Sequence, residues 1–162
     1  MANTTENPAF AAHDHDDCVA RGLDTAEAIC EAKKLRLTPI RRLALEILIS
    51  EHRAMGAYDV LAVLADRGQA AHPPVAYRAL DFLVTHGLAH KIERLAAYVA
   101  CAHPTEGHRP AFLICRECQL VAEAHVPKDD GALGKAARSL GFHIEETVIE
   151  AEGLCPKCQK AA

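Results

Sequence analysis

The chain has 162 residues, of which 50% are hydrophobic and 25% are charged, and its formal net charge at pH 7 is -4. No stretch approaches the roughly 18 uninterrupted apolar residues that a transmembrane helix requires, and the first residues lack the features of an export signal. We therefore expect a cytoplasmic protein without a membrane partner. In that reducing compartment, the 7 cysteines indicate metal ligation rather than a disulfide framework.

Charge is distributed unevenly along the chain. Lys and Arg number 1 against 7 Asp and Glu in residues 1–32, 10 against 6 in residues 33–94, and 7 against 9 in residues 95–162. Only the middle block is basic, which suits a protein in which that block alone meets nucleic-acid phosphates. Residues 1–22 are interpreted as a flexible acidic arm. The arm contains three residues to which we assign no role: His13, His15 and Cys18.

Four helices are predicted in the first half of the chain. The first spans about residues 24–35, and the second opens at Thr38, an N-cap residue that precedes a proline in the first helical turn. The third is expected over residues 57–67, ending at Gly68, and the fourth over residues 73–86. Short consecutive helices of this kind indicate a helix-turn-helix.

The fourth predicted helix has one apolar face and one exposed face. Four apolar residues recur at helical spacing and are expected to face the core: Ala76, Ala79, Leu80 and Leu83. The opposite face leaves Val75, Tyr77 and Arg78 exposed near the N-terminal end, where a recognition helix contacts DNA.

A β-hairpin is predicted next, with strands over residues 88–92 and 97–101 and a turn near Glu93. A hairpin that directly follows a helix-turn-helix indicates the wing of a winged helix. The predicted DNA-binding residues come from the third helix, the fourth helix and this wing: Tyr58, Val75, Tyr77, Arg78 and Lys91.

The second half of the chain follows an aperiodic stretch, residues 102–110, which we interpret as a hinge linker. Strands are expected over residues 111–115, 119–123 and 142–152, and an amphipathic helix is expected over residues 129–140. The mixture of helices and strands in separate segments predicts the α+β fold class.

Two C-x2-C pairs, separated by 36 residues, lie in this second half: Cys115, Cys118, Cys155 and Cys158. Four thiolates at this spacing favour a closed tetrahedral zinc site with a structural role. One alternative is that the cysteines are small buried hydrophobes, and another is a redox pair. The repeated two-residue spacing argues against the first, and the lack of a thioredoxin-like strand-helix setting argues against the second.

A second group of metal-ligating residues is spread along the chain: His90, Cys101, His108 and Glu123. Each residue alone is more often a surface or hydrogen-bonded side chain. All four, however, fall around the junction between the two halves, where a metal ion can fix the relative orientation of two domains.

An enzymatic alternative rests on His143-x-Glu145 followed by the second cysteine pair, which resembles the signature of zinc deaminases. Pro156 lies inside the cysteine pair rather than before it, and four thiolates leave no open position for a water nucleophile. A zinc-dependent hydrolase or deaminase is therefore a distant alternative, and we expect neither catalysis nor a small-molecule substrate.

Several motifs follow one another in a specific order: PPVAYRALDFL at residues 73–83, His90-Lys91, Tyr98-Val99-x-Cys101, the first cysteine pair, Gly141-Phe142, and VIEAEGLCPKC at residues 148–158. In these motifs the chain resembles the ferric uptake regulator family, and within it the zinc uptake regulator branch. The similarity spans about residues 24–158. One departure is Val75-Ala76, where the family usually has Ser or Thr followed by Val.

The resemblance implies a zinc-responsive transcriptional repressor that binds an AT-rich palindromic operator as a zinc-loaded homodimer and represses zinc-uptake genes. It implies two zinc ions per subunit, a structural ion on the four paired cysteines and a regulatory ion on the second group. The alternative within the family is a regulator that responds to iron(II) or manganese, but the Cys101 thiolate favours zinc.

The predicted architecture is therefore an N-terminal winged helix-turn-helix DNA-binding domain, followed by a small α/β dimerisation domain with a four-cysteine zinc site. The expected boundaries are residues 1–22 for the arm, 23–101 for the winged helix, 102–110 for the linker, and 111–162 for the dimerisation and metal-binding domain.

Overall fold

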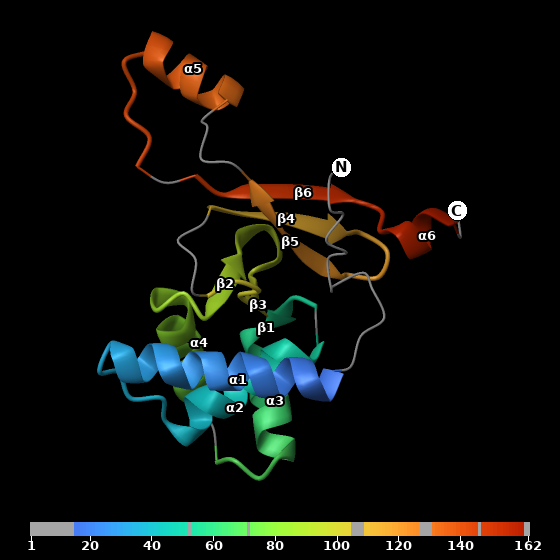
Figure 1. Ribbon diagram of the computed structural model, residues 1–162. Coiled ribbons are helices and arrows are strands. Elements are labelled where there is room, and N and C mark those ends of the chain that lie inside the picture. The colour runs from blue at the N-terminus through green and yellow to red at the C-terminus, as the bar shows by residue number, and fades with distance from the viewer. Residues whose placement is uncertain are drawn as a thin grey trace.

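The computed structural model describes residues 15–51, 53–70, 72–104, 109–126, 131–145 and 147–160. The first part of the chain contains α1 (His15–Ala32), α2 (Pro39–Glu51), β1 (Met55–Gly56), α3 (Ala57–Asp66), α4 (Pro73–Thr85), β2 (Ala89–Ile92), the 3-10 helix η1 (Glu93–Leu95) and β3 (Ala97–Ala100). The second part contains β4 (Arg109–Cys115), β5 (Val121–Val126), α5 (Gly131–Ser139), β6 (Ile149–Gly153) and α6 (Pro156–Lys160). Figure 1 shows the first four helices at one end, the two sheets beyond them, and α5 standing away from both.

The first four helices enclose the larger hydrophobic core. The four residues predicted to face inward from α4 are all buried, and they pack with Leu48 of α2 and Val60 of α3. Burial of one such leucine or valine contributes about 1.5–3 kcal/mol relative to its exposure, as an upper estimate. This core holds α4 in place and leaves its opposite face toward solvent.

Helices α3 and α4 stop where the sequence predicts, because each is followed by a glycine in the left-handed region. Gly68 has φ 78° and Gly87 has φ 73°. Beyond Gly87, the Leu88 N–H donates to the Leu83 carbonyl at 2.8 Å, which satisfies a carbonyl in the last turn. A side chain at either glycine would strain the backbone.

Helix α1 begins at His15, so the prediction of a start near Asp24 is wrong, and residues 15–22 are helical rather than part of a flexible arm. The physical reason is that Cys18 and Val19 extend the apolar stripe of the helix onto the core. Gly22 lets the helix lie close to α2, because a Cβ there would approach Ile49 Cδ1 to 2.7 Å. His13 lies outside the described residues.

The wing is a three-stranded antiparallel sheet with the strand order β1-β3-β2. The predicted hairpin is confirmed, with η1 at its turn, and Lys91 lies opposite Tyr98 in the register. Strand β1 was not predicted, because its two residues are too few to show an alternating pattern.

The second sheet has the strand order β5-β4-β6, in which β4 is antiparallel to β5 and parallel to β6. The first two predicted strands and the helix are confirmed, with boundaries that differ by a few residues. The third strand is much shorter than the predicted 142–152, because only Ile149–Gly153 finds a partner in β4. Helix α6 was not predicted.

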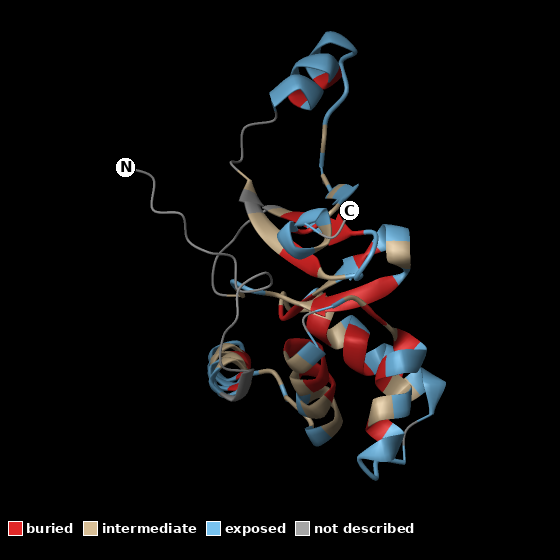
Figure 2. Cartoon of the chain, turned by 90° about the vertical axis from the view of Figure 1, so that its right-hand side faces the viewer, coloured by how far each residue is buried: buried red, intermediate tan, exposed pale blue. Residues whose placement is uncertain are grey.

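The two sheets meet in a smaller hydrophobic cluster. Ile92 and Val99 of the wing pack with Phe112 and Ile114 of β4 and with Val121 of β5. Figure 2 shows this band of buried residues running between the helices and the second sheet, whereas α5 is largely exposed. Within the described part of the chain, no helix combines the length and the apolar character needed to cross a bilayer.

Candidate metal centres and nucleic-acid interface

The four paired cysteines converge at one end of the second sheet. Cys115 ends β4, Cys118 lies in the turn toward β5, Cys155 follows β6, and Cys158 lies in α6. Their sulfur atoms all lie within 4.8 Å of one another, and the Cys118 and Cys155 sulfurs are 3.7 Å apart. A tetrahedron with Zn–S bonds of about 2.3 Å has edges of about 3.8 Å, so this spacing fits a zinc ion, whereas a disulfide would need about 2.05 Å.

Backbone amides lower the pKa of two of these cysteines, Cys115 and Cys155, whereas the hydrogen bond with the Cys155 side chain raises the pKa of Cys158 to about 12. The Cys155 N–H donates to the Cys115 sulfur at 3.4 Å. Hydrogen bonds from the backbone N–H groups of Cys118 and Cys155 lower the pKa of Cys115 to about 6. The thiolate is the metal-binding form, so the backbone geometry at Cys115 favours the ionised state that zinc requires.

A second set of ligands forms at the junction between the sheets. His90 of β2, Cys101 after β3 and Glu123 of β5 each offer a ligand atom, and these atoms lie within 4.8 Å of one another. His90 Nε2 is 3.6 Å from Glu123 Oε1, and the Ala102 N–H donates to Glu123 Oε2 at 2.9 Å. His108, the fourth predicted ligand, lies outside the described residues.

The three junction ligands are held by regular backbone structure. In the sheet registers His90 lies opposite Val99, and Glu123 lies opposite Phe112. The His90 and Phe112 rings are in contact, with centroids 5.3 Å apart, and the Cys101 N–H donates to the Leu88 carbonyl at 3.0 Å. Each ligand therefore depends on an element that the sequence pattern had already predicted.

The chemistry of the junction group fits a divalent metal ion. The Glu123 side chain is only 6% exposed, and burial followed by the Glu123 charge raises the pKa of Cys101 to about 12. A carboxylate with so little exposure is costly unless hydrogen bonds or a cation compensate its charge, and a cation would also favour the ionised form of the half-buried Cys101 thiol. Nitrogen, sulfur and oxygen donors together suit a four-coordinate zinc ion.

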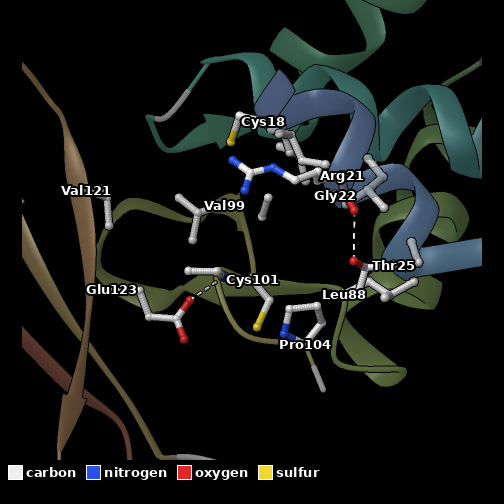
Figure 3. A pocket seen from close by; sticks show the side chains of 16 residues that line it. Cys18, Arg21, Gly22, Thr25, Leu88, Val99, Cys101, Pro104, Val121 and Glu123 are labelled. Atoms are coloured by element: carbon white, nitrogen blue, oxygen red, sulfur yellow. Dashed lines mark hydrogen bonds between the residues drawn. The ribbon is translucent and has the colours of Figure 1, made fainter. Parts of the chain in front are cut away.

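A cavity of about 310 Å³ borders this group. Figure 3 shows Cys18 and Arg21 of α1 on one wall, and Cys101 and Glu123 on the opposite wall. The cavity therefore lies where α1, the wing and β5 meet. The cavity, whose walls are mainly apolar, lies between α1 and the junction ligands.

Most of the predicted DNA-binding side chains are exposed on the winged helix. Tyr58 of α3 is 66% exposed and Tyr77 of α4 is 42% exposed, and their rings pack edge to face with centroids 6.5 Å apart. Arg78 is exposed beside them, and Val75 is half-buried. The N-terminal ends of the two helices thus form one surface.

The wing continues this surface. Lys91 is exposed on β2, and its Nζ lies 3.0 Å from Glu93 Oε2. Burial and the nearby charge of Asp81 in α4 raise the pKa of Tyr98, whereas Lys91, its neighbour in the strand register, lowers it. A recognition helix and an adjacent basic wing are suited to a major groove and its flanking phosphates.

Comparison with known proteins identifies the family. No family model matches the sequence. Over 139 residues the chain is 39% identical to the zinc uptake regulation protein of Escherichia coli (strain K12), and the match covers 84% of this chain and 80% of that protein. The chain belongs to the zinc uptake regulator family. The resemblance predicted from the motifs is confirmed, and membership of this family of transcription regulators confirms that the chain is not an enzyme.

Solved structures of zinc uptake regulators share this fold. One regulator in complex with zinc and DNA is 36% identical, with a TM-score of 0.82 over 88% of this chain and 96% of that chain. The holo form of the regulator XcZur is 38% identical, with a TM-score of 0.76 over 86% and 97%. The apo form of XcZur has a TM-score of 0.52 over 88% and 99%, at 35% identity. The predicted α+β fold class is thereby confirmed.

The structure brings together seven of the eight predicted metal ligands, in two groups, and it leaves four of the five predicted DNA-binding residues exposed on the winged helix, with Val75 half-buried. The roles of these residues remain predictions. Sequence analysis assigned no role to Glu150, although its carboxylate contacts the wing turn. No spacing rule points to this contact, because it joins two elements that meet only in the folded chain.

Proposed function

We propose that this chain is a zinc-responsive transcriptional repressor, which binds operator DNA as a zinc-loaded homodimer and represses zinc-uptake genes in the cytoplasm. The observation that carries the proposal is the junction group. His90 and Cys101 come from the winged helix, and Glu123 comes from the second sheet. An ion held by all three ties the DNA-binding surface to the rest of the molecule.

Each subunit holds two zinc ions in this proposal. The structural ion occupies the four paired cysteines, and the regulatory ion occupies His90, Cys101 and Glu123, with His108 as the predicted fourth ligand. The tetrathiolate stabilises the end of the second sheet irrespective of the regulatory state. The thiol in the junction group favours zinc over iron(II) or manganese(II), which bind nitrogen and oxygen more readily.

The relative arrangement of the two halves of the chain supports a role for metal in DNA binding. The chain superposes better on the regulator with zinc and DNA, and on holo XcZur, than on apo XcZur, although the sequence identity is similar for all three structures. We infer that metal at the junction stabilises the described arrangement against others in which the winged helix is turned away.

The homodimer is supported by apolar surface on the second half of the chain. Six exposed large hydrophobic residues lie there: Leu113, Leu133, Leu140, Phe142, Val148 and Ile149. Strand β6 is an edge strand of its sheet, and edge strands with apolar neighbours commonly pair with another chain. A two-fold dimer places two recognition helices on two half-sites, which implies a palindromic operator, and the family resemblance suggests that it is AT-rich.

The test begins with duplexes that the zinc-loaded protein selects from a random-sequence pool. Binding of the selected duplex is then measured with zinc, iron(II), manganese(II) or a chelator. We expect the duplex to be palindromic, and we expect zinc to increase its affinity by about 5- to 150-fold over the chelated protein. Failure to select any duplex, or equal binding with chelator, would overturn the proposal. A stronger response to iron(II) would reassign the effector.

A further inference from the structure

A carboxylate of the second sheet holds the turn of the wing. Glu150 Oε1 accepts a hydrogen bond from the Glu93 N–H at 2.8 Å, and Glu150 Oε2 accepts one from the Arg94 N–H at 3.1 Å. Both donors belong to η1, at the tip of the hairpin, whereas Glu150 lies in β6, more than fifty positions later in the chain. The contact therefore joins the two halves of the molecule.

The sheet register explains why Glu150 reaches the wing. In the parallel pairing of β4 with β6, Glu150 lies beside Phe112. Phe112 is buried against Ile92 and Val99, the wing residues on either side of the η1 turn. Apolar packing thus brings the turn to β6, and the carboxylate then satisfies two backbone N–H groups of η1.

The wing also contacts the other edge of the second sheet. The backbone of Arg53, which precedes β1, forms an isolated antiparallel bridge with Leu120, which precedes β5. At the β6 edge, Arg94 Nη2 adds an exposed ion pair with Glu152 Oε2 at 3.2 Å. The wing is therefore held at both edges of the second sheet, and the junction ligands lie on β2, directly after β3, and on β5.

We propose that Glu150 is a positioning residue that clamps the wing turn to β6 and stabilises the DNA-binding arrangement without ligating metal. We call this contact, between the Glu150 carboxylate and the Glu93 and Arg94 N–H groups, the Glu150 clamp. The proposal rests on the proposed function and adds a residue to its mechanism. Hydrogen bonds to a charged acceptor are stronger than neutral ones, and two from a single carboxylate also fix its direction.

The Glu150 clamp also orients a predicted DNA contact. The Glu93 backbone donates to Glu150, and the Glu93 side chain pairs with Lys91 at 3.0 Å. By fixing the backbone of η1, the clamp also fixes the Glu93 carboxylate, which pairs with the Lys91 ammonium group on the wing.

The clamp and the regulatory zinc stabilise the same arrangement of domains, so they are linked thermodynamically. Weakening the clamp reduces the population of the arrangement that binds zinc and DNA. The two apparent affinities then fall together, although Glu150 is not one of the described residues whose ligand atoms converge at either metal group.

The experiment compares Glu150→Gln with Glu152→Gln. Both variants remove one carboxylate from β6, but Glu152 makes an exposed side-chain pair with Arg94, which is worth little. Three quantities are measured: zinc affinity at the regulatory site, affinity for the duplex selected by the wild-type protein, and hydrogen exchange at the Glu93 and Arg94 amides. For Glu150→Gln we expect both affinities to weaken about three- to tenfold and the two amides to exchange faster.

The control variant is expected to stay within about twofold of wild type in both affinities, since an exposed ion pair contributes little. Both variants should retain the structural zinc and remain folded, with a thermal unfolding midpoint within a few degrees of wild type. The clamp is overturned if Glu150→Gln matches Glu152→Gln in zinc affinity and in amide exchange. These two measurements need no DNA, so they test the Glu150 clamp even if the wild-type protein shows no zinc-dependent DNA binding. Absence of zinc-dependent DNA binding in wild type would instead overturn the proposed function.

Discussion

Cys101 gives the junction group its chemical character. Its thiol lies with an imidazole and a carboxylate whose ligand atoms are all within 4.8 Å of one another. Without the sulfur, the remaining nitrogen and oxygen donors would suit iron(II) or manganese(II) equally well. In the proposed function, the preference of the junction group for zinc therefore depends on one side chain.

Replacing Cys101 with serine is expected to leave one zinc ion per chain, on the four paired cysteines, and to abolish zinc-dependent operator binding. A serine hydroxyl is a poor zinc ligand, so the link between wing and second sheet loses its anchor. Metal content and duplex affinity are measured on the same sample. Cys18→Ser serves as the control, because Cys18 lines the same cavity but is not in the ligand group. A second zinc ion and normal DNA binding in Cys101→Ser would make Cys101 a mere packing residue.

The raised pKa of Cys101 makes regulatory zinc binding dependent on pH. With the pKa at about 12, the thiol is protonated at neutral pH and must release a proton to bind zinc. Zinc affinity should therefore rise by about tenfold per pH unit from this residue alone, between about pH 7.5 and 9, where ordinary imidazoles are neutral. Competition with a zinc-binding dye at several pH values measures the slope.

Cys101→Asp is the matched control for this pH dependence. Its carboxylate is already ionised in that range, so its weaker zinc binding should change little with pH. Equal slopes for the thiol and the carboxylate would show that the proton comes from another group.

At the scale of elements, α4 and the wing present two kinds of contact to DNA. Arg78 lies near the start of α4, on the face opposite the buried residues, and its guanidinium can form two hydrogen bonds with a guanine. Lys91 lies on β2 beside Glu93, and an ammonium group on a wing is better suited to a phosphate. The two substitutions should therefore have different signatures.

Arg78→Ala is expected to weaken binding of the selected duplex by about 1–3 kcal/mol and to relax specificity at one base pair. Lys91→Ala should weaken all duplexes alike and reduce the salt slope by about one. Titrations at several salt concentrations, with the selected duplex and with single-base variants, separate these outcomes. Arg138→Ala, on the distant helix α5, controls for the loss of charge. A uniform loss for Arg78→Ala would identify it as a phosphate contact.

Elements with strong local signals were predictable, and those that depend on distant partners were not. Helix α4 has a proline start, an apolar stripe and a glycine after its end, so it could be read from the sequence. The beginning of α1 could not, because its polar residues conceal the contact of Cys18 and Val19 with the core. Strand β6 ends up shorter than its composition suggests, because a strand persists only where a neighbour pairs with it.

For the whole molecule, the second half combines the four-cysteine group with exposed apolar surface. Helix α5 stands away from the rest of the chain in both views of the fold (Figures 1 and 2). The exposed residues Leu140 and Phe142 follow it directly. In the proposed dimer, a partner chain would bury this surface. Zinc bound to the four cysteines would stabilise the second sheet, which is connected to α5.

Cys115→Ser is expected to lose the structural zinc and the dimer together, because metal binding at a structural site supplies folding free energy. Phe142→Asp should retain the zinc but weaken the dimer, because it places a charge on the apolar surface without touching a ligand. Sedimentation equilibrium and zinc content are measured for both variants. A stable dimer of normal mass in Cys115→Ser would count against the tetrathiolate as a structural centre.

The sequence by itself determined the helix-turn-helix, the wing and the two cysteine pairs, because each depends on spacing within a short segment. Hydrophobic periodicity, helix caps and C-x2-C spacing act over distances at which neighbouring residues constrain one another directly. For the same reason the motifs sufficed to indicate the family, which the comparisons then confirmed.

The family resemblance implied that His90, Cys101 and Glu123 share a metal ion, but only the tertiary structure shows that their ligand atoms converge and that Glu150 reaches the wing turn. Their positions follow from sheet registers and from the packing of Phe112 between the two halves. Such contacts join residues far apart in the chain, and no local pattern encodes the distance between them. They form when burial of apolar surface brings two sheets together, which is a property of the folded chain as a whole.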